Sequence, residues 1–219
     1  MKKITAQSLR MSGEQKFKED DSLSFSRETT NRAELLVFTD QFQCYKSRLS
    51  DFDDGKASQL GDYLPQKLGF DADEKVVQVI LPGDYKGFVL FFFENGKAAK
   101  VPLSAYETKT NRRKLTGAYS DKSPLRSCMS FETDVQVAMY STDGRCLIFS
   151  TAQLMPKTTR NTQGVSVMSL KKKAILSHAV AAKNRGIVNL SRYRTKTIPA
   201  AGALLKEEDS SEKQITFEV

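Results

Sequence analysis

The side chains that could carry out chemistry are few in this chain, and they do not form a recognisable catalytic set. The only histidine, His178, alternates with apolar residues in a predicted strand, which favours a structural role. Without a second histidine, neither a zinc site nor a Ser-His-Asp arrangement is supported. The carboxylates Asp51, Asp53 and Asp54 resemble a calcium-binding loop only loosely, because the glycine and distal glutamate of that motif are misplaced. We therefore predict no catalytic residue, no metal site and no cofactor, so that the chain by itself is not an enzyme.

The three cysteines, Cys44, Cys128 and Cys146, are an odd number without a CxxC or Cys/His pairing. They are best interpreted as unpaired thiols in a reducing compartment, with Cys44 and Cys146 in predicted core strands. The first residues also lack the apolar core of a secretory signal, which favours a cytoplasmic protein.

The charge of the chain is unevenly distributed, and this points to binding. Residues 97–196 carry 19 Lys and Arg against 5 Asp and Glu, a net charge of +14. The remaining residues carry 15 against 21, a net charge of −6. So concentrated a positive charge indicates a polyanionic partner. Nucleic acid is favoured over a membrane, because no amphipathic basic helix and no apolar run of spanning length is apparent.

The basic residues also recur at a fixed spacing. The sequence Lys-Thr-Asn-Arg at 109–112 returns as Lys-Thr-Thr-Arg at 157–160, an offset of 48 residues that Asn-Gly at 95–96 and Asp-Gly at 143–144 share. Further basic stretches follow at 171–173 and 192–196. The candidate DNA-binding residues are Lys109, Arg112, Arg113, Lys114, Lys157, Arg160, Lys171, Lys172, Lys173, Arg192, Arg194 and Lys196.

These basic loops are set among predicted β-hairpins. Apolar runs at 34–39, 87–93 and 135–140 each lead through a short turn into a second run, at 42–46, 97–101 and 145–149. Asn-Gly and Asp-Gly turns between apolar runs are strong hairpin signals, because tight turns need positive φ. In the first hairpin Phe42 stands where the others have glycine, so we expect a looser turn there.

A short elbow follows each hairpin, and a further β-like run follows at 74–80, 125–131 and 174–180. A repeat of about four strands is typical of a propeller blade. We therefore predict one all-β domain with a partial blade at 1–32, blades at 33–86, 87–134 and 135–183, and a closing segment with an acidic tail at 184–219. Repeated blades would place the basic loops around one rim, as a curved track for DNA phosphates.

The ends of the sequence suggest an incomplete set of blades. Residues 2–9 resemble the second strand and elbow of another hairpin, with no first strand before them. Either the chain is a fragment of a longer protein, or the missing strand comes from 184–219, which ends in a β-like run at 214–217. We favour the fragment.

This pattern resembles the C-terminal domain of the A subunit of bacterial type II topoisomerases, DNA gyrase and topoisomerase IV. The resemblance covers about residues 1–181. It rests on hairpins with a Phe-Thr … Leu-Ser-x-Phe pattern, as at 38–52, and on Thr-Arg-Asn-Thr-Gln-Gly-Val at 159–165. The segment 193–202 also looks like the closing segment of such subunits. The resemblance implies a β-pinwheel, a propeller-like ring whose basic edge bends DNA and presents a segment to the cleavage core.

By the same resemblance, the DNA contacts would be made by the loop cations at 109, 112–114, 157 and 160. The partners would be double-stranded DNA, the upstream cleavage core and, through it, the ATPase B subunit, in the nucleoid of a bacterial cytoplasm. The Gln-Arg-Arg-Gly-Gly-Lys-Gly box that marks gyrase is absent, which favours a topoisomerase IV-like or divergent member.

We therefore predict a non-catalytic domain that binds and bends duplex DNA and orients it for strand passage. One alternative is a propeller-like scaffold that binds an acidic protein, for which binding would depend weakly on salt. A free-standing enzyme is the other alternative, and the poor inventory of catalytic side chains argues against it.

Overall fold

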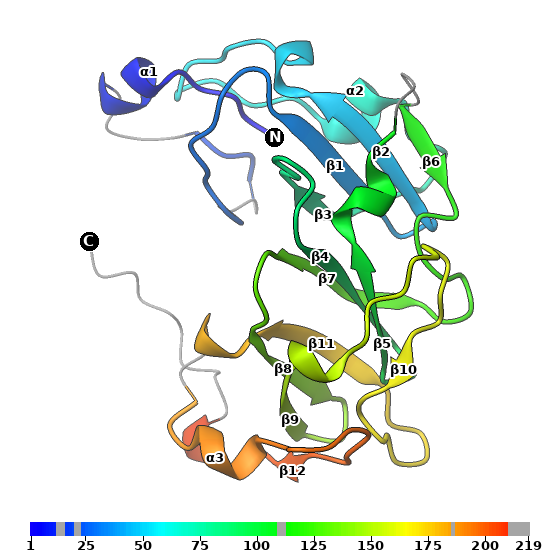
Figure 1. Cartoon of the computed structure of the whole chain (residues 1–219). Coiled ribbons are helices and arrows are strands. Elements are labelled where there is room, and N and C mark those ends of the chain that lie inside the picture. Colours follow the sequence, from blue (N-terminus) through cyan, green and yellow to red (C-terminus); the bar gives the residue numbers. More distant parts are fainter. Residues whose placement is uncertain (12–15, 20–22, 109–112, 185–186, 210–219) are drawn as a thin grey trace. The chain divides into compact units, whose positions relative to one another are not determined.

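The computed structural model describes residues 1–11, 16–19, 23–108, 113–184 and 187–209. Its contacts divide the chain into two compact units. Unit 1 comprises Met1–Asp84 and Thr110–Thr116, and unit 2 comprises Tyr85–Lys109 and Gly117–Val219. Three antiparallel four-stranded sheets account for most of the regular structure, so the prediction of an all-β fold is confirmed (Figure 1).

Unit 1 contains one sheet, which we call sheet A, with strands in the order β3-β1-β2-β6. Its strands are β1 (Glu34–Thr39), β2 (Gln43–Arg48), β3 (Val76–Ile80) and β6 (Lys114–Thr116). Two short helices, α1 (Ala6–Met11) and α2 (Leu64–Leu68), belong to the same unit. One face of the sheet, with Leu35, Val37 and Tyr45, packs against Phe52 and Leu64.

Unit 2 contains sheet B, in the order β10-β5-β4-β7, and sheet C, in the order β11-β8-β9-β12. The strands of sheet B are β4 (Phe88–Phe93), β5 (Lys97–Pro102), β7 (Leu125–Phe131) and β10 (Val165–Ser166). Those of sheet C are β8 (Gln136–Ser141), β9 (Arg145–Ser150), β11 (Leu176–Ala181) and β12 (Ala203–Leu204). The predicted hairpins and the third strand of each repeat therefore form where the sequence placed them.

Short helical turns end the hairpins and shape the last part of the chain. The elbow after each hairpin is a 3₁₀ turn, and a third α-helix lies near the end of unit 2. These elements are the 3₁₀ turns Leu49–Asp51, Leu103–Tyr106, Thr151–Gln153, Ala182–Asn184 and Glu207–Asp209, and the helix α3 (Leu190–Tyr193).

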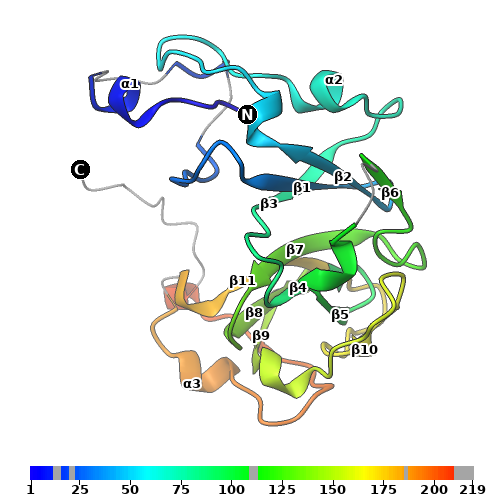
Figure 2. The same ribbon diagram turned by 45° about the horizontal axis from the view of Figure 1, so that its top comes forward.

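The fourth strand of each sheet comes from further along the chain. β10 follows the hairpin β8–β9 in sequence, yet it pairs with β5 of the preceding hairpin (Figures 1 and 2). β6 likewise follows β4–β5 but pairs with β2. The segments expected as blades at 87–134 and 135–183 thus each give one strand to the sheet of the segment before. This satisfies backbone groups that an open edge of β2 or β5 would leave without partners.

The turn of the first hairpin is not looser than the others, so that expectation is wrong. Phe42 adopts a φ of 59°, close to the 77° of Gly96 and the 75° of Gly144. All three hairpins close in the same register, which demands a left-handed residue before the second strand. The half-buried Phe42 is held in that conformation by the strands on either side.

The strand expected at 2–9 is also wrong. Among the described residues of 1–32 no strand forms, and α1 takes up 6–11. The first residues bind the loop after the first elbow instead. The amino group of Met1 donates to the Asp62 carbonyl at 2.6 Å, and the Gly55 amide donates to the Lys3 carbonyl at 2.8 Å. The β-like run expected at 214–217 lies outside the described residues.

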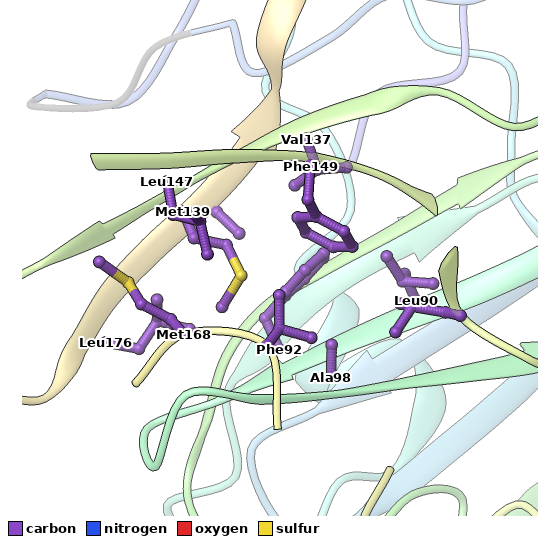
Figure 3. Packing of buried hydrophobic residues seen from close by; sticks show 12 residues of the cluster. Leu90, Phe92, Ala98, Val137, Met139, Leu147, Phe149, Met168 and Leu176 are labelled. Carbon is purple, nitrogen blue, oxygen red and sulfur yellow. The ribbon is translucent and has the colours of Figure 1, made fainter. Parts of the chain in front are cut away.

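The core of unit 2 lies between sheets B and C. Figure 3 shows Phe92 of β4 among side chains from β8 and β9, and its ring meets that of Phe149 edge-on, with centroids 6.5 Å apart. The other face of sheet C, with Tyr140 and Ile148, is covered by Ile187 and Tyr193 of the last segment. Sheet C is therefore buried on both faces.

The junction before β10 gives a prediction about stability. Gly164 has a φ of 69°, and an added Cβ would lie 2.0 Å from the Ala98 carbonyl oxygen. We expect Gly164→Ala to weaken the pairing of β10 and lower the free energy of unfolding by more than the roughly 1–2 kcal/mol that a left-handed alanine costs. Gly144→Ala is the control, because Gly144 has a φ of 75° but nothing within 4 Å of its added Cβ. Equal losses for the two variants in urea unfolding would contradict the role of Gly164.

Candidate nucleic-acid interface

One backbone position recurs in all three sheets. The strands β2, β5 and β9 pair in the same register with the first strand of their hairpins. The fourth residue of each is therefore structurally equivalent, and it is Lys46, Lys100 or Ile148. We call the stretch of chain that leads to the fourth strand of a sheet its crossover segment. At this position each of the three strands meets the crossover segment of its sheet.

A backbone hydrogen bond joins the equivalent position to the crossover segment in each sheet. The pairs are Lys46 and Arg113 at 2.7 Å, Lys100 and Lys157 at 2.8 Å, and Ile148 and Thr195 at 2.8 Å. Each crossover segment then pairs in the ladder, at the next residue as β6 in sheet A and eight residues later as β10 and β12 in sheets B and C. The three crossover segments are therefore held to their sheets at the same level of the strand.

Exposed cations accompany each of these meeting points. Arg113 and Lys157 occupy two of them, and Arg194 and Lys196 flank Thr195 at the third. By position in the sheet, Lys157 corresponds to Arg113, whereas the sequence offset of 48 aligned it with Lys109. The basic loops are thus equivalent in the sheets, although their lengths differ. The continuous track around one rim stays a prediction.

Arg160 serves the crossover segment of sheet B as an anchor. Its guanidinium donates to the Ala105 carbonyl at 3.2 Å and lies 6.0 Å from the centroid of the Tyr106 ring. Both contacts belong to the elbow after β5, and the Arg160 side chain is only partly exposed. This cation is therefore engaged with protein, so it holds the loop in place more than it offers charge to a ligand.

Lys114 is also engaged with protein. Its ammonium lies 2.6 Å from the Asp71 carboxylate and 5.5 Å from the centroid of the Tyr45 ring. The hydrogen bond to Asp71 raises the pKa of Lys114, and the same bond lowers the pKa of Asp71. The positive charge of Lys114 is thus compensated locally, whereas Arg113 is an exposed cation among the described residues of that segment.

The other candidate residues are distributed over unit 2. Lys171, Lys172 and Lys173 are exposed in the turn that leads into β11. Arg192, in α3, lies over the ring of Tyr193 at 6.0 Å. The exposed Arg194 donates to the Gln136 side chain at 2.9 Å.

Two of the predicted residues, Lys109 and Arg112, lie outside the described residues.

An ion pair between a buried lysine and an exposed aspartate was missed from the sequence. Lys100 is 4 % exposed, and its ammonium lies 2.7 Å from Asp134 and 3.2 Å from the Thr151 carbonyl. It also lies 4.5 Å from the centroid of the Phe88 ring. A lysine inside the apolar second strand of a hairpin is the signal that could have predicted this contact. The Lys100 backbone carbonyl accepts a hydrogen bond from the Lys157 amide. The residue that forms the ion pair therefore also forms the meeting point of sheet B.

The histidine and the three cysteines are packed against other protein groups. His178 stacks on Tyr140 with centroids 4.6 Å apart, and all three cysteines are buried without a disulfide. Burial raises the pKa of the Cys146 thiol to about 12, which makes it a poor nucleophile. Among the residues that the structure describes, no group of three metal-binding side chains occurs. No helix in the described ranges is long and apolar enough to cross a membrane.

Comparison with known proteins connects this arrangement to one class. No family model matches the chain. In sequence, it is 26% identical over 157 residues to the A subunit of DNA topoisomerase 4 from Staphylococcus aureus. The match takes in 70% of this chain and 20% of that protein, so the chain spans about a fifth of the length of such relatives.

Solved structures agree on the fold. The C-terminal domain of DNA topoisomerase IV matches with a TM-score of 0.72 and 21% identity, over 82% of this chain and 57% of that one. The DNA gyrase A C-terminal domain gives 0.58 and 17%, over 83% and 64%. The E. coli ParC C-terminal domain gives 0.59 and 13%, over 76% and 69%.

The fold is that of the C-terminal β-pinwheel domains of type II topoisomerase A subunits. Within this class, the sequence relative belongs to topoisomerase IV. The resemblance found from the sequence is therefore confirmed.

The ion pair gives a prediction about acid stability. Asp134→Asn would leave the Lys100 ammonium buried without its counter-ion. We expect a loss of about 1–3 kcal/mol in the free energy of unfolding, less than for a fully buried pair because Asp134 is 43% exposed. The hydrogen bond from Lys100 lowers the pKa of Asp134, so the wild type loses this contribution as pH falls through that lowered pKa. Urea unfolding at neutral and acidic pH should show the two proteins converging at low pH.

Glu132→Gln is the matched control, since Glu132 is exposed and two residues away. It should leave stability at neutral pH nearly unchanged. An Asp134→Asn variant as stable as this control would show that the ion pair contributes nothing.

Proposed function

We propose that this chain is a non-catalytic domain of a type II topoisomerase A subunit that binds and bends duplex DNA. Its crossover segments contact phosphates and orient the DNA segment for strand passage. The parent protein would supply the cleavage core, and an ATPase B subunit would join through that core. The named relatives support this assignment, because they are A subunits. The matched region is about a fifth of their length, so the rest of the parent protein would lie outside this chain. A bacterial cytoplasm, at the nucleoid, is the corresponding location.

The observation that carries the proposal is the recurrence of exposed cations where crossover segments meet their sheets. Arg113, Lys157 and the pair Arg194 and Lys196 are placed by backbone hydrogen bonds at equivalent positions. A duplex presents phosphates at regular intervals. Cations held at the same position in each sheet suit that regular spacing. In their described residues the crossover segments contain no helix longer than the four residues of α3, so contact with phosphates rather than base edges is the expected mode.

Bending is the expected consequence of contacts on successive blades. Sheets B and C of unit 2 each contribute a crossover segment, so a duplex that binds both must follow the path from one sheet to the other. Bending a site of 20–30 base pairs costs on the order of 1–6 kcal/mol, which added phosphate contacts would offset. Affinity should therefore rise with duplex length.

An acidic protein remains the alternative partner, because the same cations would attract carboxylates. The two partners differ in salt dependence. DNA binding releases condensed counter-ions, whereas an acidic protein surface carries no comparable counter-ion atmosphere.

The test is the salt dependence of binding to random-sequence duplex DNA. Lys157→Glu combined with Lys196→Glu removes one exposed cation from each crossover segment of unit 2. We expect weaker binding to all sequences alike, and a slope of log K against log salt that is smaller by about 2. Fluorescence anisotropy on short and long duplexes across a salt series measures both quantities.

A variant with Lys183→Glu alone is the control, because Lys183 is exposed in unit 2 but lies 12 residues before Thr195, where the crossover segment meets sheet C. It should retain most of the affinity and nearly the full slope. Absence of wild-type binding at low salt would exclude DNA as the partner of this chain.

A further inference from the structure

A second set of equivalent loops lies at the opposite end of the strands. The first residue of each hairpin turn donates a backbone hydrogen bond to the residue just before or at the start of the third strand. The donor and acceptor pairs are Asp40 and Lys75 at 3.0 Å, Glu94 and Pro124 at 2.8 Å, and Thr142 and Ile175 at 2.9 Å. The four residues before each acceptor, 71–74, 120–123 and 171–174, are therefore equivalent. We call these segments the entry turns.

The entry turns differ in charge although their position is the same. That of sheet A carries Asp71, Asp73 and the buried Glu74, and that of sheet B carries Asp121 and Lys122. The entry turn of sheet C carries three consecutive lysines at 171–173, all of them exposed. The fold thus presents an acidic, a neutral and a basic turn in equivalent places. Since the backbone frame is common to all three, the charge is a property that the fold does not require.

In sheet C the basic entry turn lies beside the turn before β9, whereas the crossover segment meets β9 at its fourth residue, Ile148. The Thr142 amide donates to the Ile175 carbonyl at 2.9 Å, which holds the end of the entry turn beside Thr142 and Asp143 in the turn before β9. Thr195 meets the same strand at Ile148. Five residues separate Asp143 from Ile148, or about 17 Å of extended chain. Two groups of cations therefore lie about one strand length apart.

This spacing suits the two phosphate backbones that border one groove of a duplex. The major groove of B-DNA is about 12 Å wide, and a row of phosphates runs along each side of it. Cations placed beside two points of one strand about 17 Å apart can reach both rows. We propose that sheet C grips duplex DNA by both strands, with the lysines of its entry turn on one backbone and the crossover cations Arg194 and Lys196 on the other. This proposal rests on the proposed function.

By the same reasoning, sheet C is expected to bind the duplex more tightly than sheets A and B. Sheet A carries Arg113 at its crossover segment, but its entry turn exposes Asp71 and Asp73. Asp71 is paired with Lys114, but Asp73 adds a negative charge that disfavours phosphates at that end of sheet A. Sheet B offers crossover cations and a turn of no net charge. One-strand contact is expected for these two sheets, and two-strand contact for sheet C.

The first test reverses charge in the basic entry turn. Lys172→Glu combined with Lys173→Glu should weaken binding to a long random duplex at least tenfold. In hydroxyl-radical footprinting, protection should disappear from one strand and persist on the other. Lys122→Glu is the matched control in the equivalent turn of sheet B, and it should change affinity less than twofold. Circular dichroism and urea unfolding establish that each variant is folded.

The second test transfers the basic turn to sheet A. Ala72→Lys combined with Asp73→Lys keeps Asp71 and its ion pair with Lys114. Lysine is compatible with the left-handed φ of 61° at position 73, because Lys173 adopts 71° at the equivalent place in sheet C. We expect severalfold tighter binding and protection that extends to the second strand over a longer stretch of DNA.

The outcomes separate this proposal from the proposed function. If the entry-turn variant binds like the wild type while the Lys157 and Lys196 variant binds weakly, DNA binding stands and the two-strand grip is wrong. Loss of protection on both strands alike would also overturn the grip. If the wild type does not bind duplex DNA at low salt, both proposals fail.

Discussion

The pairing of each second hairpin strand with a strand from further along the chain is the constraint on which this structure depends. Without β10, the backbone of β5 would present unpaired groups at an edge. The chain must therefore leave its own hairpin, cross to the preceding sheet and return. Each crossing places a loop at the same level of a strand, and exposed cations occur at each of these places.

Packing makes these crossings rigid enough to position charges. In unit 2 the side chains between sheets B and C form a closely packed core, and the last segment covers the far face of sheet C. The buried Lys100 adds an ion pair just under the meeting point of Lys157. Arg160 and Lys114 are bound to protein groups nearby. A basic residue in a loop of this fold thus either binds protein groups and holds the loop, or leaves its charge exposed to solvent. The contacts of its side chain show which of the two it does.

The repeated frame separates what the fold requires from what function can vary. The entry turns show this most clearly, because Asp73 and Lys173 share a left-handed conformation and an equivalent place while carrying opposite charges. Backbone geometry demands a residue that tolerates that conformation, but it does not specify the charge. Charge can therefore differ from sheet to sheet without a change of fold.

The sequence by itself determined the hairpins, the third strands, the all-β class and the family resemblance, because these depend on local alternation and on turn chemistry within a few residues. It did not determine which sheet β6, β10 and β12 join, since such short strands are specified by distant partners. Only the tertiary structure decided that Phe42 takes a glycine-like conformation, that residues 6–11 are helical, and that Arg160 and Lys114 are engaged with protein. Each of these depends on contacts between residues far apart in the chain, and a periodic pattern carries no information about them.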